Sequence, residues 1–303
     1  MKNEGLTEVT VFTPTYNRAS LLGRLYKSLE KQTNKKFEWV IVDDGSTDDT
    51  REKVKFFRRK ATFPIRYIYK RNEGKHIAIN EGVKIASGKW FFIVDSDDYL
   101  TESAIETVLQ YCKSIEGDPN CAGVVGLRGN SNREILFDYG KTYGKRDKFF
   151  QKEYIDATSI EYRYKYKIHG DRAEVLRTKL LKRYPFPKFK GERFLTEGYL
   201  WLSLSRDGYY FRWFNKIIYI TEYLADGLSA NMSEIARNNP QATFFMADFC
   251  LGIKGLPFIE YLKNSCRYYL YGKINGNKTI DLIRKDKKKV LALSGILLAW
   301  IKG

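Results

Sequence analysis

The sequence is poor in the residues that most metal and redox sites need. It has two histidines, His76 and His169, and four scattered cysteines that form no CxxC pair. Two histidines exclude a three-histidine metal site, and the absence of CxxC excludes a zinc ribbon or a thioredoxin-type redox site. The scatter of the cysteines indicates free, mostly buried thiols in a reducing compartment. Carboxylates therefore remain as the groups available for chemistry.

The signals of several other protein classes are also missing. No GxxxxGK(S/T) or GxGxxG string occurs, so neither a P-loop nor a standard dinucleotide fingerprint has support. No apolar run reaches the length of about 18 residues that predicts a membrane-spanning helix. Residues 1–12 lack the apolar stretch of a signal peptide, so we expect a cytoplasmic protein.

The composition is that of a globular protein with an excess of positive charge. Of 303 residues, 43% are hydrophobic, and 53 Lys and Arg against 36 Asp and Glu give a net charge of +17. At about 100–200 residues per domain, this length predicts one large domain with an appendage, or two domains. The charge and the 22 tyrosines leave a nucleic-acid-binding surface as one alternative, although no recognised motif supports it.

Strand and helix signals alternate along the N-terminal third of the chain. Short apolar, β-branched runs predict strands at 9–14, 37–42, 65–69 and 90–94. Helical spacing predicts helices at 21–29, 46–59 and 77–85, the second opened by a capping box of Ser46 and Asp49. This order predicts an α/β fold whose mostly parallel, twisted sheet carries helices on both faces.

The alternation becomes irregular beyond residue 123. We expect strands at 123–127 and 211–220, a helix from Gly198, and a polar, basic loop at 130–150. Residues 232–303 carry no strand signals and predict helices with breaks near Pro240, Pro257 and Gly276.

A polar cluster follows each of the four N-terminal strands. Open α/β sheets bind ligands at the carboxyl ends of their strands. One cluster alone is equally well a turn, but four at one edge predict a binding site. The clusters are Tyr16-Asn17, Asp43-Asp44-Gly45, Asn72-Glu73-Gly74 and Asp95-Ser96-Asp97-Asp98.

The last of these clusters places three carboxylates within four residues. Such crowding is unfavourable unless a cation or hydrogen-bond donors compensate it. Oxygen ligands suit Mg²⁺ or Mn²⁺, which typically bind one or two carboxylates together with substrate phosphates. A solvated acidic turn is the alternative. The preceding strand and the helix signal from Thr101 favour the metal site.

The first two clusters also have two interpretations each. Asp43-Asp44-Gly45 is either a turn or an acceptor of hydrogen bonds from a base or a ribose. Tyr16 is either a stacking platform beside it or an ordinary loop aromatic.

Together these strings resemble the motifs of family 2 glycosyltransferases, which have the GT-A nucleotide-diphospho-sugar transferase fold and invert the anomeric configuration. The matching strings are VFTPTYNR at 11–18, VDDGSTD at 42–48, NEGKHIAIN at 72–80 and VDSDD at 94–98. The resemblance covers about residues 7–230; residues 191–201 are similar to the acceptor-side segment, and 222–229 to a bacterial polysaccharide-type subgroup. It implies a GT-A domain at 1–230, with a nucleotide-sugar-binding half (1–110) and an acceptor half (111–230), and a helical region at 231–303.

The resemblance also implies roles for individual residues. Tyr16 would pack on a uracil ring, and Asp44 would accept its ring N–H. Lys75 and Asn80 would lie near the ribose or diphosphate, and Asp97 or Asp98 would bind a divalent metal, Mn²⁺ or Mg²⁺. The implied nucleotide-sugar-binding residues are Thr13, Tyr16, Asn17, Arg18, Asp44, Lys75, Asn80, Asp95, Ser96 and Asp97.

Inverting transfer needs a base that deprotonates the acceptor hydroxyl on the face opposite the leaving diphosphate. Glu197 is the predicted base, because it precedes Gly198 at the helix start of the acceptor-side segment. Many family members carry an acidic pair there, whereas this chain has Thr196-Glu197-Gly198. The alternative is that Glu197 only caps the helix and that Glu192 or Asp171 is the base.

The reaction implied by the resemblance moves a sugar from a nucleotide-diphosphate sugar, expected to be a UDP-sugar, to a hydroxyl of a glycan or lipid-linked acceptor in cell-surface polysaccharide synthesis. A sugar nucleotidyltransferase of similar fold is the closest alternative. Such enzymes usually begin with a glycine-rich phosphate loop, and residues 13–18 contain no glycine.

The C-terminal stretch joins a basic cluster at 285–289 to a mostly apolar run at 290–301. This run is shorter than the about 20 residues that span a bilayer, so it predicts an interfacial helix with Trp300 at headgroup depth. Peripheral association through 285–303 would bring the site to a lipid-linked acceptor at the inner face of the cytoplasmic membrane. A core helix docked on the catalytic domain, or a homodimer contact, is the alternative.

Overall fold

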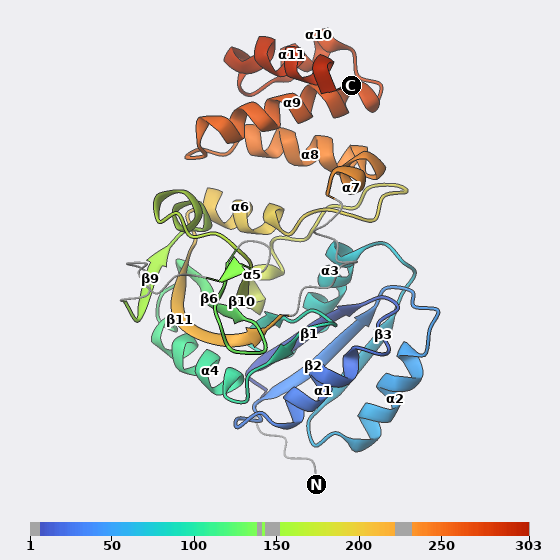
Figure 1. Cartoon of the computed structure of the whole chain (residues 1–303), viewed down its shortest axis with the longest axis vertical. Coiled ribbons are helices and arrows are strands. Elements are labelled where there is room, and N and C mark those ends of the chain that lie inside the picture. Colours follow the sequence, from blue (N-terminus) through green and yellow to red (C-terminus); the bar gives the residue numbers. More distant parts are fainter. Residues whose placement is uncertain (1–6, 138–140, 143–151, 222–231, 303) are drawn as a thin grey trace.

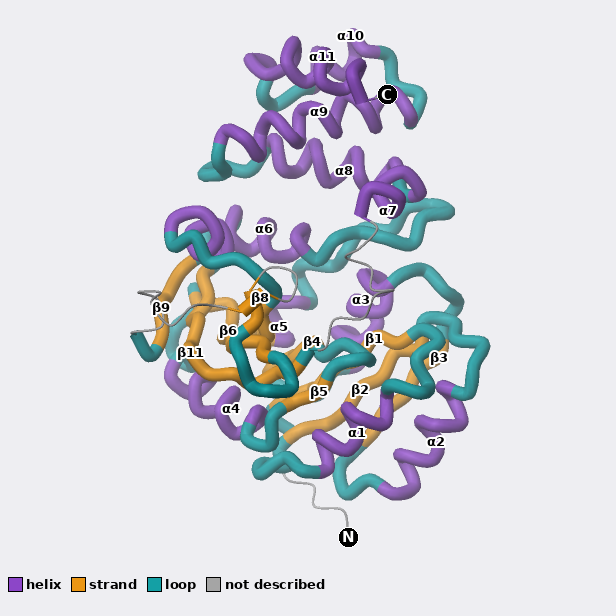
Figure 2. The backbone as a smooth tube through the Cα atoms, viewed as in Figure 1, coloured by secondary structure: helices purple, strands orange, loops and turns teal. Residues whose placement is uncertain are grey.

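A mixed nine-stranded sheet forms the centre of the computed structural model, which describes residues 7–137, 141–142, 152–221 and 232–302 (Figures 1 and 2). The strand order is β3-β2-β1-β4-β10-β6-β11-β5, with β9 paired to β11. The predicted parallel pairing holds for the first four strands. These are β1 (Val9–Thr15), β2 (Phe37–Asp43), β3 (Ile65–Tyr69) and β4 (Trp90–Ile93).

Beyond β4 the sheet is no longer purely parallel. β10 (Arg172–Arg177) runs antiparallel to both β4 and β6 (Cys121–Gly129). β11 (Tyr210–Ile220) is parallel to β6 and antiparallel to β5 (Tyr99–Leu100) and β9 (Tyr154–Ala157). The expectation of a continuous loop at 130–150 is wrong in part, because β7 (Leu136–Phe137) and β8 (Lys141–Thr142) pair there.

Helices cover both faces of the sheet, as predicted. One face packs against α1 (Leu22–Glu30), α2 (Thr50–Lys60) and α4 (Ala104–Ser114). The other packs against α3 (Lys75–Ile85), α5 (Thr178–Leu181) and α6 (Gly198–Arg206). Side chains alternate along β1, so that Val11 belongs to the first core and Phe12 to the second. All four cysteines are free and buried, which confirms the prediction made for them.

The predicted capping box at the start of α2 is wrong. Asp49 occupies the N-cap position without a side-chain cap hydrogen bond. Asp48 caps the helix instead, because its Oδ1 accepts hydrogen bonds from the N–H and the hydroxyl of Thr50, at 3.1 and 2.6 Å. The Ser46 hydroxyl accepts a hydrogen bond from the Asn17 N–H, at 2.8 Å. Ser46 therefore joins two strand-end loops.

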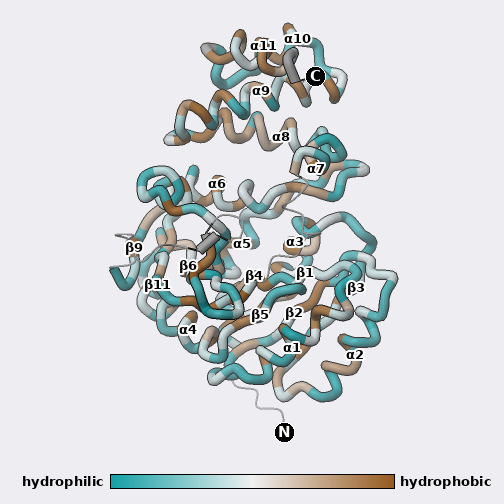
Figure 3. Tube along the Cα trace, in the orientation of Figure 1, coloured by the Kyte–Doolittle hydropathy of each residue, from teal (hydrophilic) through white to brown (hydrophobic). Residues whose placement is uncertain are grey.

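The C-terminal helices form a stack at the end of the molecule opposite the N-terminus (Figure 1). They have a core of their own, which includes Leu251, Tyr268 and Tyr269, and Figure 3 shows hydrophobic segments on α9 and α11. Among the helices in the described ranges, none is both long and apolar enough to cross a membrane. The stack consists of α7 (Met232–Asn238), α8 (Pro240–Leu251), α9 (Phe258–Ile274), α10 (Thr279–Lys285) and α11 (Ala292–Lys302).

Candidate active site

The register of the parallel strands brings the four polar clusters to one edge of the sheet. Thr15 at the end of β1 pairs with Asp43 at the end of β2, and Asp43 pairs with Tyr69 at the end of β3. On the other side of β1, Phe12 pairs with Ile93, the last residue of β4. The loops after these strands therefore lie next to each other, as the sequence predicts.

The loops after β1 and β2 hold each other in place and leave Tyr16 exposed. Asn17 has a left-handed backbone with φ of 52°, and its Oδ1 accepts a hydrogen bond from the Thr47 N–H, at 2.8 Å. Asp48 accepts another from the Ala19 N–H, at 3.0 Å. Because the backbone around it is fixed, the exposed Tyr16 ring is available to a ligand at a defined place.

Asp44 connects the end of β2 to the start of α3. Its carboxylate accepts hydrogen bonds from the N–H groups of Glu73 and Gly74, at 2.9 and 2.7 Å, and its Oδ1 lies 2.6 Å from Lys70 Nζ. Gly74 has a φ of 94°, and a Cβ there would lie 1.8 Å from the Arg193 carbonyl oxygen. A larger residue than glycine would therefore push apart the loop before α3 and the loop that contains Arg193. The resemblance implies that Asp44 accepts a hydrogen bond from the uracil ring. In the structure its carboxylate instead fixes the loop that precedes Lys75.

Lys75, the first residue of α3, bridges two carboxylates from opposite sides of the site. Its Nζ lies 2.6 Å from Asp95 Oδ1 and 2.7 Å from Glu197 Oε1. Burial opposes the charge on Lys75, but the two carboxylates outweigh it and raise the pKa of the ammonium group. Burial alone would raise the pKa of Asp95. The positive charges of Lys75 and Arg128 outweigh it and lower the pKa of this carboxyl group.

Asp98 faces two residues that sequence reasoning missed. The Tyr219 hydroxyl donates to Asp98 Oδ2 at 2.8 Å and accepts from the Asp95 N–H at 2.9 Å. Arg128 lies over the Tyr219 ring, 4.1 Å from its centroid, and its Nη1 is 3.5 Å from Asp98 Oδ2. Burial, together with the charges of Asp95 and Asp97, raises the pKa of Asp98 to about 7. Arg128 lies on β6 and Tyr219 on β11, far from the motif in sequence, so no local signal could have found them.

Asp97 is the carboxylate best placed to meet a metal ion. Its backbone carbonyl accepts a hydrogen bond from Arg24 Nη2, at 2.7 Å. Among the described residues, no hydrogen bond or ion pair reaches its carboxylate, and no three His, Cys, Asp or Glu side chains are grouped to hold a metal by themselves. A divalent ion bound by one or two carboxylates and completed by substrate phosphates fits this donor set.

Four other residues implied by the resemblance have structural partners or buried positions. The Thr13 hydroxyl accepts a hydrogen bond from Trp39 Nε1, at 2.9 Å. The Asn80 amide pairs with the backbone N–H and carbonyl of Phe186, both at 2.8 Å, so it contacts the loop between α5 and α6 instead of an open site. Arg18 is half-buried and Ser96 is buried.

The structure separates the alternatives for the base. Glu197 lies at the N-cap position of α6 but makes no side-chain cap hydrogen bond; its carboxylate contacts Lys75. Glu192 caps α8, because its two oxygens accept hydrogen bonds from the N–H groups of Gln241 and Ala242, at 2.7 and 2.8 Å. Asp171 is exposed before β10. Glu197 is therefore the one of the three that contacts the carboxylate cluster through Lys75.

The loop that carries Glu197 is also held at its start by α8. Besides the contacts of Glu192, the Asn239 Oδ1 at the N-cap of α8 accepts hydrogen bonds from the N–H groups of Arg193 and Phe194, at 2.9 and 3.0 Å. The acceptor-side loop is thus fixed to the C-terminal helices.

Glu174 on β10 is a second acidic residue that the sequence did not reveal. Burial raises the pKa of its carboxyl group to about 8, and the charges of Glu197 and Asp171 add to the rise. It is therefore mostly protonated at neutral pH. The β10 sequence, RAEVLR, mixes charged and apolar residues and gave no strand signal of its own.

Comparison with known proteins places the chain in a family. Residues 10–176, more than half of the chain, match the family described as glycosyl transferase family 2. An uncharacterized glycosyltransferase of Rickettsia felis is 41% identical over 105 residues, which are 35% of this chain and 17% of that protein. The GalNAc(5)-diNAcBac-PP-undecaprenol beta-1,3-glucosyltransferase of Campylobacter jejuni is 29% identical over 206 residues, which are 67% of this chain and 61% of that protein. The chain thus spans less than two thirds of either relative.

Solved structures share the fold. A crystal structure of Staphylococcus aureus TarS, residues 1–349, has a TM-score of 0.57 at 21% identity, over 97% of this chain and 87% of that one. The mannosyltransferase PcManGT from Pyrobaculum calidifontis, in complex with GDP-Man and Mn²⁺, has a TM-score of 0.58 at 18% identity, over 99% and 87%. This likeness confirms the predicted GT-A fold with its helical C-terminal region. Residues 222–229, which resemble a polysaccharide-type subgroup, lie outside the described residues.

Proposed function

Because the chain belongs to glycosyl transferase family 2, we propose that it is an inverting, metal-dependent glycosyltransferase. It moves a sugar from a UDP-sugar to a hydroxyl of a glycan or lipid-linked acceptor in cell-surface polysaccharide synthesis. The observation that carries the proposal is the contact of Lys75 with both Asp95 and Glu197. The family match favours this reading over a sugar nucleotidyltransferase or a nucleic-acid-binding protein.

The choice of donor and acceptor is supported by the relatives. TarS has been solved with UDP and with UDP-GlcNAc, and the Campylobacter relative is named for an undecaprenol-linked acceptor. In our proposal residues 1–230 form the GT-A domain, in which 1–110 bind the nucleotide sugar and 111–230 bind the acceptor. Residues 231–303 form the helical C-terminal region.

The nucleotide sugar lies along the carboxyl edge of the parallel strands. Tyr16 packs on the nucleotide base. The Asn17-Arg18 loop and the Asp95-Ser96-Asp97 loop flank the ribose and diphosphate. Asp97, with Asp98 as its neighbour, would hold a Mn²⁺ or Mg²⁺ ion, and a divalent ion bound there would offset the negative charge that grows on the departing diphosphate. Lys75 supplies a fixed positive charge on the same side of the site.

Glu197 deprotonates the acceptor hydroxyl. The contact with Lys75 orients its carboxylate at the border between the donor loops and α6. A positioned general base contributes about 10²- to 10⁴-fold to the rate of such a reaction. Glu174, mostly protonated beside it, adds no competing negative charge.

We also propose that α11 lies at the inner face of the cytoplasmic membrane. Leu293, Leu297 and Trp300 recur at helical spacing, with exposed fractions of 84%, 59% and 76%. The opposite face of α11, which includes Ala292 and Ala299, belongs to the core of the C-terminal helices. One face of α11 therefore packs on the other C-terminal helices instead of the catalytic domain, and the face with Leu293, Leu297 and Trp300 is exposed. The exposed lysines Lys285 and Lys289 add attraction to anionic lipid, about 1 kcal/mol each when close to the surface.

The experiment that tests the function is a screen of UDP-sugars, GDP-mannose and dTDP-sugars for metal-dependent release of the nucleoside diphosphate without acceptor. We expect slow hydrolysis of one UDP-sugar in the presence of Mn²⁺ or Mg²⁺. Addition of a lipid-linked acceptor should accelerate release and give a product of inverted configuration. Metal-independent release, or formation of a nucleotide sugar from a sugar phosphate, would contradict the proposal.

A further inference from the structure

A large cavity separates the acceptor side of the sheet from the C-terminal helices. Its volume is about 1180 Å³, and its lining comes from β10, α6 and the π-helical turn Glu161–Lys165 on one side and from α7, α8 and α9 on the other. Glu174, Thr196 and Gly198 are part of the lining. The cavity therefore reaches the immediate neighbours of Glu197.

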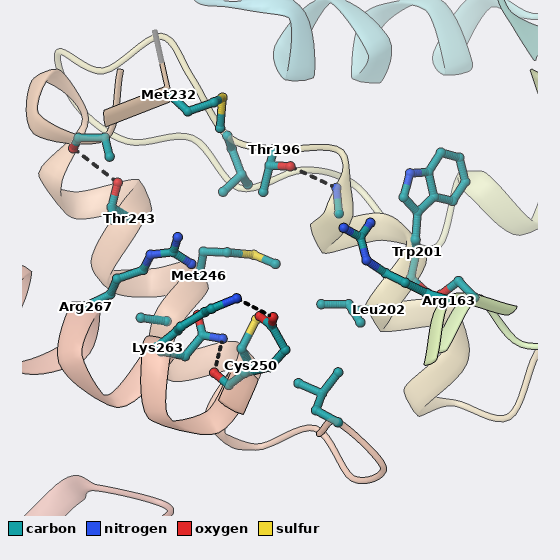
Figure 4. Close-up of a pocket in the computed structure, with 18 of the residues that line it drawn as sticks. Arg163, Thr196, Trp201, Leu202, Met232, Thr243, Met246, Cys250, Lys263 and Arg267 are labelled. Atoms are coloured by element: carbon teal, nitrogen blue, oxygen red, sulfur yellow. Dashed lines mark hydrogen bonds and ion pairs between the residues drawn. The ribbon is translucent and has the colours of Figure 1, made fainter. Parts of the chain in front are cut away.

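Part of the cavity wall is apolar although water can reach it. Met232, Ile259 and Ile274 line the cavity and are exposed, so the fold leaves these large apolar side chains uncovered. Met246 and Leu202 continue the apolar wall deeper in (Figure 4). Exposed apolar side chains gathered in one hollow mark a binding site for an apolar group.

Positive charges are interspersed with this apolar wall. Figure 4 shows Arg163 on one side and Lys263 and Arg267 on the other, pointing toward the space between them. Arg237 also lines the cavity. Among the described residues, no carboxylate forms an ion pair with Arg163, Arg237 or Arg267, whereas Lys263 lies 2.9 Å from Glu260. Within the described ranges these three arginines have no carboxylate partner, which favours an anionic ligand.

We infer that this cavity binds a lipid-linked acceptor at its phosphate or diphosphate, an inference that rests on the proposed function. The arginines bind the phosphate oxygens, since guanidinium groups match them by paired hydrogen bonds. The apolar wall at Met232, Ile259 and Ile274 takes the first part of the lipid chain. The sugar that follows the phosphate then lies toward Glu174 and Glu197. A free phosphate would leave the apolar wall in water, and an uncharged glycan would leave the arginines unpaired.

Binding of farnesyl diphosphate, used as a short soluble lipid diphosphate, tests this inference without donor or metal. Trp201 lines the cavity, so its fluorescence reports occupancy. We expect farnesyl diphosphate to bind at least about tenfold tighter than pyrophosphate or farnesol, because only it uses both the charges and the apolar wall. Equal binding of pyrophosphate, or no binding of farnesyl diphosphate, would overturn the inference. The inference would also be overturned if vesicles of anionic phospholipid changed the Trp201 fluorescence as much as farnesyl diphosphate does.

Two sets of variants locate the ligand. Arg163→Ala and Arg267→Ala should each weaken farnesyl diphosphate binding by about tenfold, since each removes a charge-assisted hydrogen bond. Arg284→Ala, which removes an exposed arginine of α10 outside the cavity, is the matched control and should leave binding unchanged. Ile259→Asn with Ile274→Asn should weaken farnesyl diphosphate but not pyrophosphate. Unchanged binding in these variants would place the ligand elsewhere.

Release of UDP without acceptor separates this inference from the proposed function. The cavity variants should release UDP at the wild-type rate, because they lie outside the donor loops, and should lose acceleration by a lipid-linked acceptor. Wild-type protein that binds farnesyl diphosphate but hydrolyses no nucleotide sugar would contradict the proposed function alone. Normal UDP release without lipid diphosphate binding would contradict the cavity assignment alone.

Discussion

Lys75 joins Asp95 to Glu197: its ammonium group lies within 2.7 Å of an oxygen of each carboxylate. Asp95 belongs to the strand-end loop on the donor side, and Glu197 precedes the helix on the acceptor side. One cation from a third element, α3, therefore sets the relative position of the two carboxylates to which we assign donor binding and acceptor activation.

Removal of the Lys75 charge should impair both donor binding and acceptor activation. In Lys75→Met the Asp95 and Glu197 carboxylates lose their shared cation, and the site loses a fixed charge that favours the diphosphate. We expect kcat for transfer to fall by about 100-fold, the usual effect of one electrostatic contact in an active site. Lys84→Met removes an exposed lysine of the same helix, paired with Glu81, and should leave kcat unchanged. An active Lys75→Met protein would show that the bridge is only structural.

The base assignment predicts different results for two glutamates of the same loop. Glu197→Gln should lower transfer by about 10²- to 10⁴-fold while UDP binding, measured by calorimetry, persists. Glu192→Gln should retain turnover and lose stability, about 1 kcal/mol, because one cap hydrogen bond of α8 is lost. Loss of turnover in Glu192→Gln, with turnover retained in Glu197→Gln, would assign the role of the base to Glu192.

The metal assignment rests on Asp97. Asp97→Ala should remove most activity and the metal-dependent part of the nucleotide affinity. The free energy of unfolding should change by no more than about 1 kcal/mol, because the carboxylate has no partner among the described residues. Asp49→Ala, which removes an exposed aspartate at the N-cap position of α2 that makes no side-chain cap hydrogen bond, is the control. EDTA should inhibit the wild type, and Mn²⁺ or Mg²⁺ should restore it; full activity in EDTA would refute the metal role.

His76 should make the fold sensitive to acid. Its side chain is buried, its Nδ1 has no hydrogen-bond partner among the described residues, and burial lowers the pKa of the imidazole to about 4. The unfolded chain takes up a proton near its ordinary pKa of about 6.5, before the folded one does. Stability is therefore lost as the pH falls from about 6.5 to 4, by up to about 3 kcal/mol.

Urea unfolding of wild type and His76→Gln across this pH range measures the effect of His76. The variant should lose less stability on acidification than the wild type. His169→Gln, which removes the other histidine of the chain, is the comparison variant. Parallel curves for wild type and His76→Gln would contradict the assignment.

The exposed face of α11 should carry membrane binding. Deletion of 285–303 is a poor test, because Asp286 accepts a buried hydrogen bond from Tyr269, at 2.8 Å, and Ala299 is part of the core. Combined replacement of Leu293, Leu297 and Trp300 by serine should abolish sedimentation with anionic vesicles while UDP release persists, because each side chain loses about 1.5–3 kcal/mol of apolar transfer.

Two controls accompany this triple variant. Phe258→Ser removes an exposed aromatic of α9 and should leave vesicle binding intact. Size-exclusion chromatography tests the alternative of a homodimer contact. A wild-type dimer that the triple variant dissociates, with no vesicle binding by either protein, would assign the α11 face to self-association.

The part of the site that the sequence predicted is the part built from parallel strands. Each of β1 to β4 is a short run rich in apolar, β-branched or aromatic residues and is followed by polar residues, so both the strand and its end are visible locally. Arg128, Tyr219 and Glu174 were missed because they reach the site through the order of β10, β6 and β11. That order depends on pairings between distant segments, antiparallel for β10 with β6 and parallel for β6 with β11, which no local pattern encodes. Asn80 shows the converse, since its motif was visible but its contact with Phe186 was not.

The attachment of the acceptor-side loop to α8 has a mechanical consequence. Glu192, Arg193 and Phe194 are bonded to the first turn of α8, and Glu197 follows them by only a few residues. A rigid shift of the C-terminal helices therefore displaces Glu197, the base in our proposal, relative to Asp95 and Lys75. Adsorption of α11 to a surface would thus alter turnover even for a water-soluble acceptor, and the enzyme would respond to where it is bound as well as to what it binds.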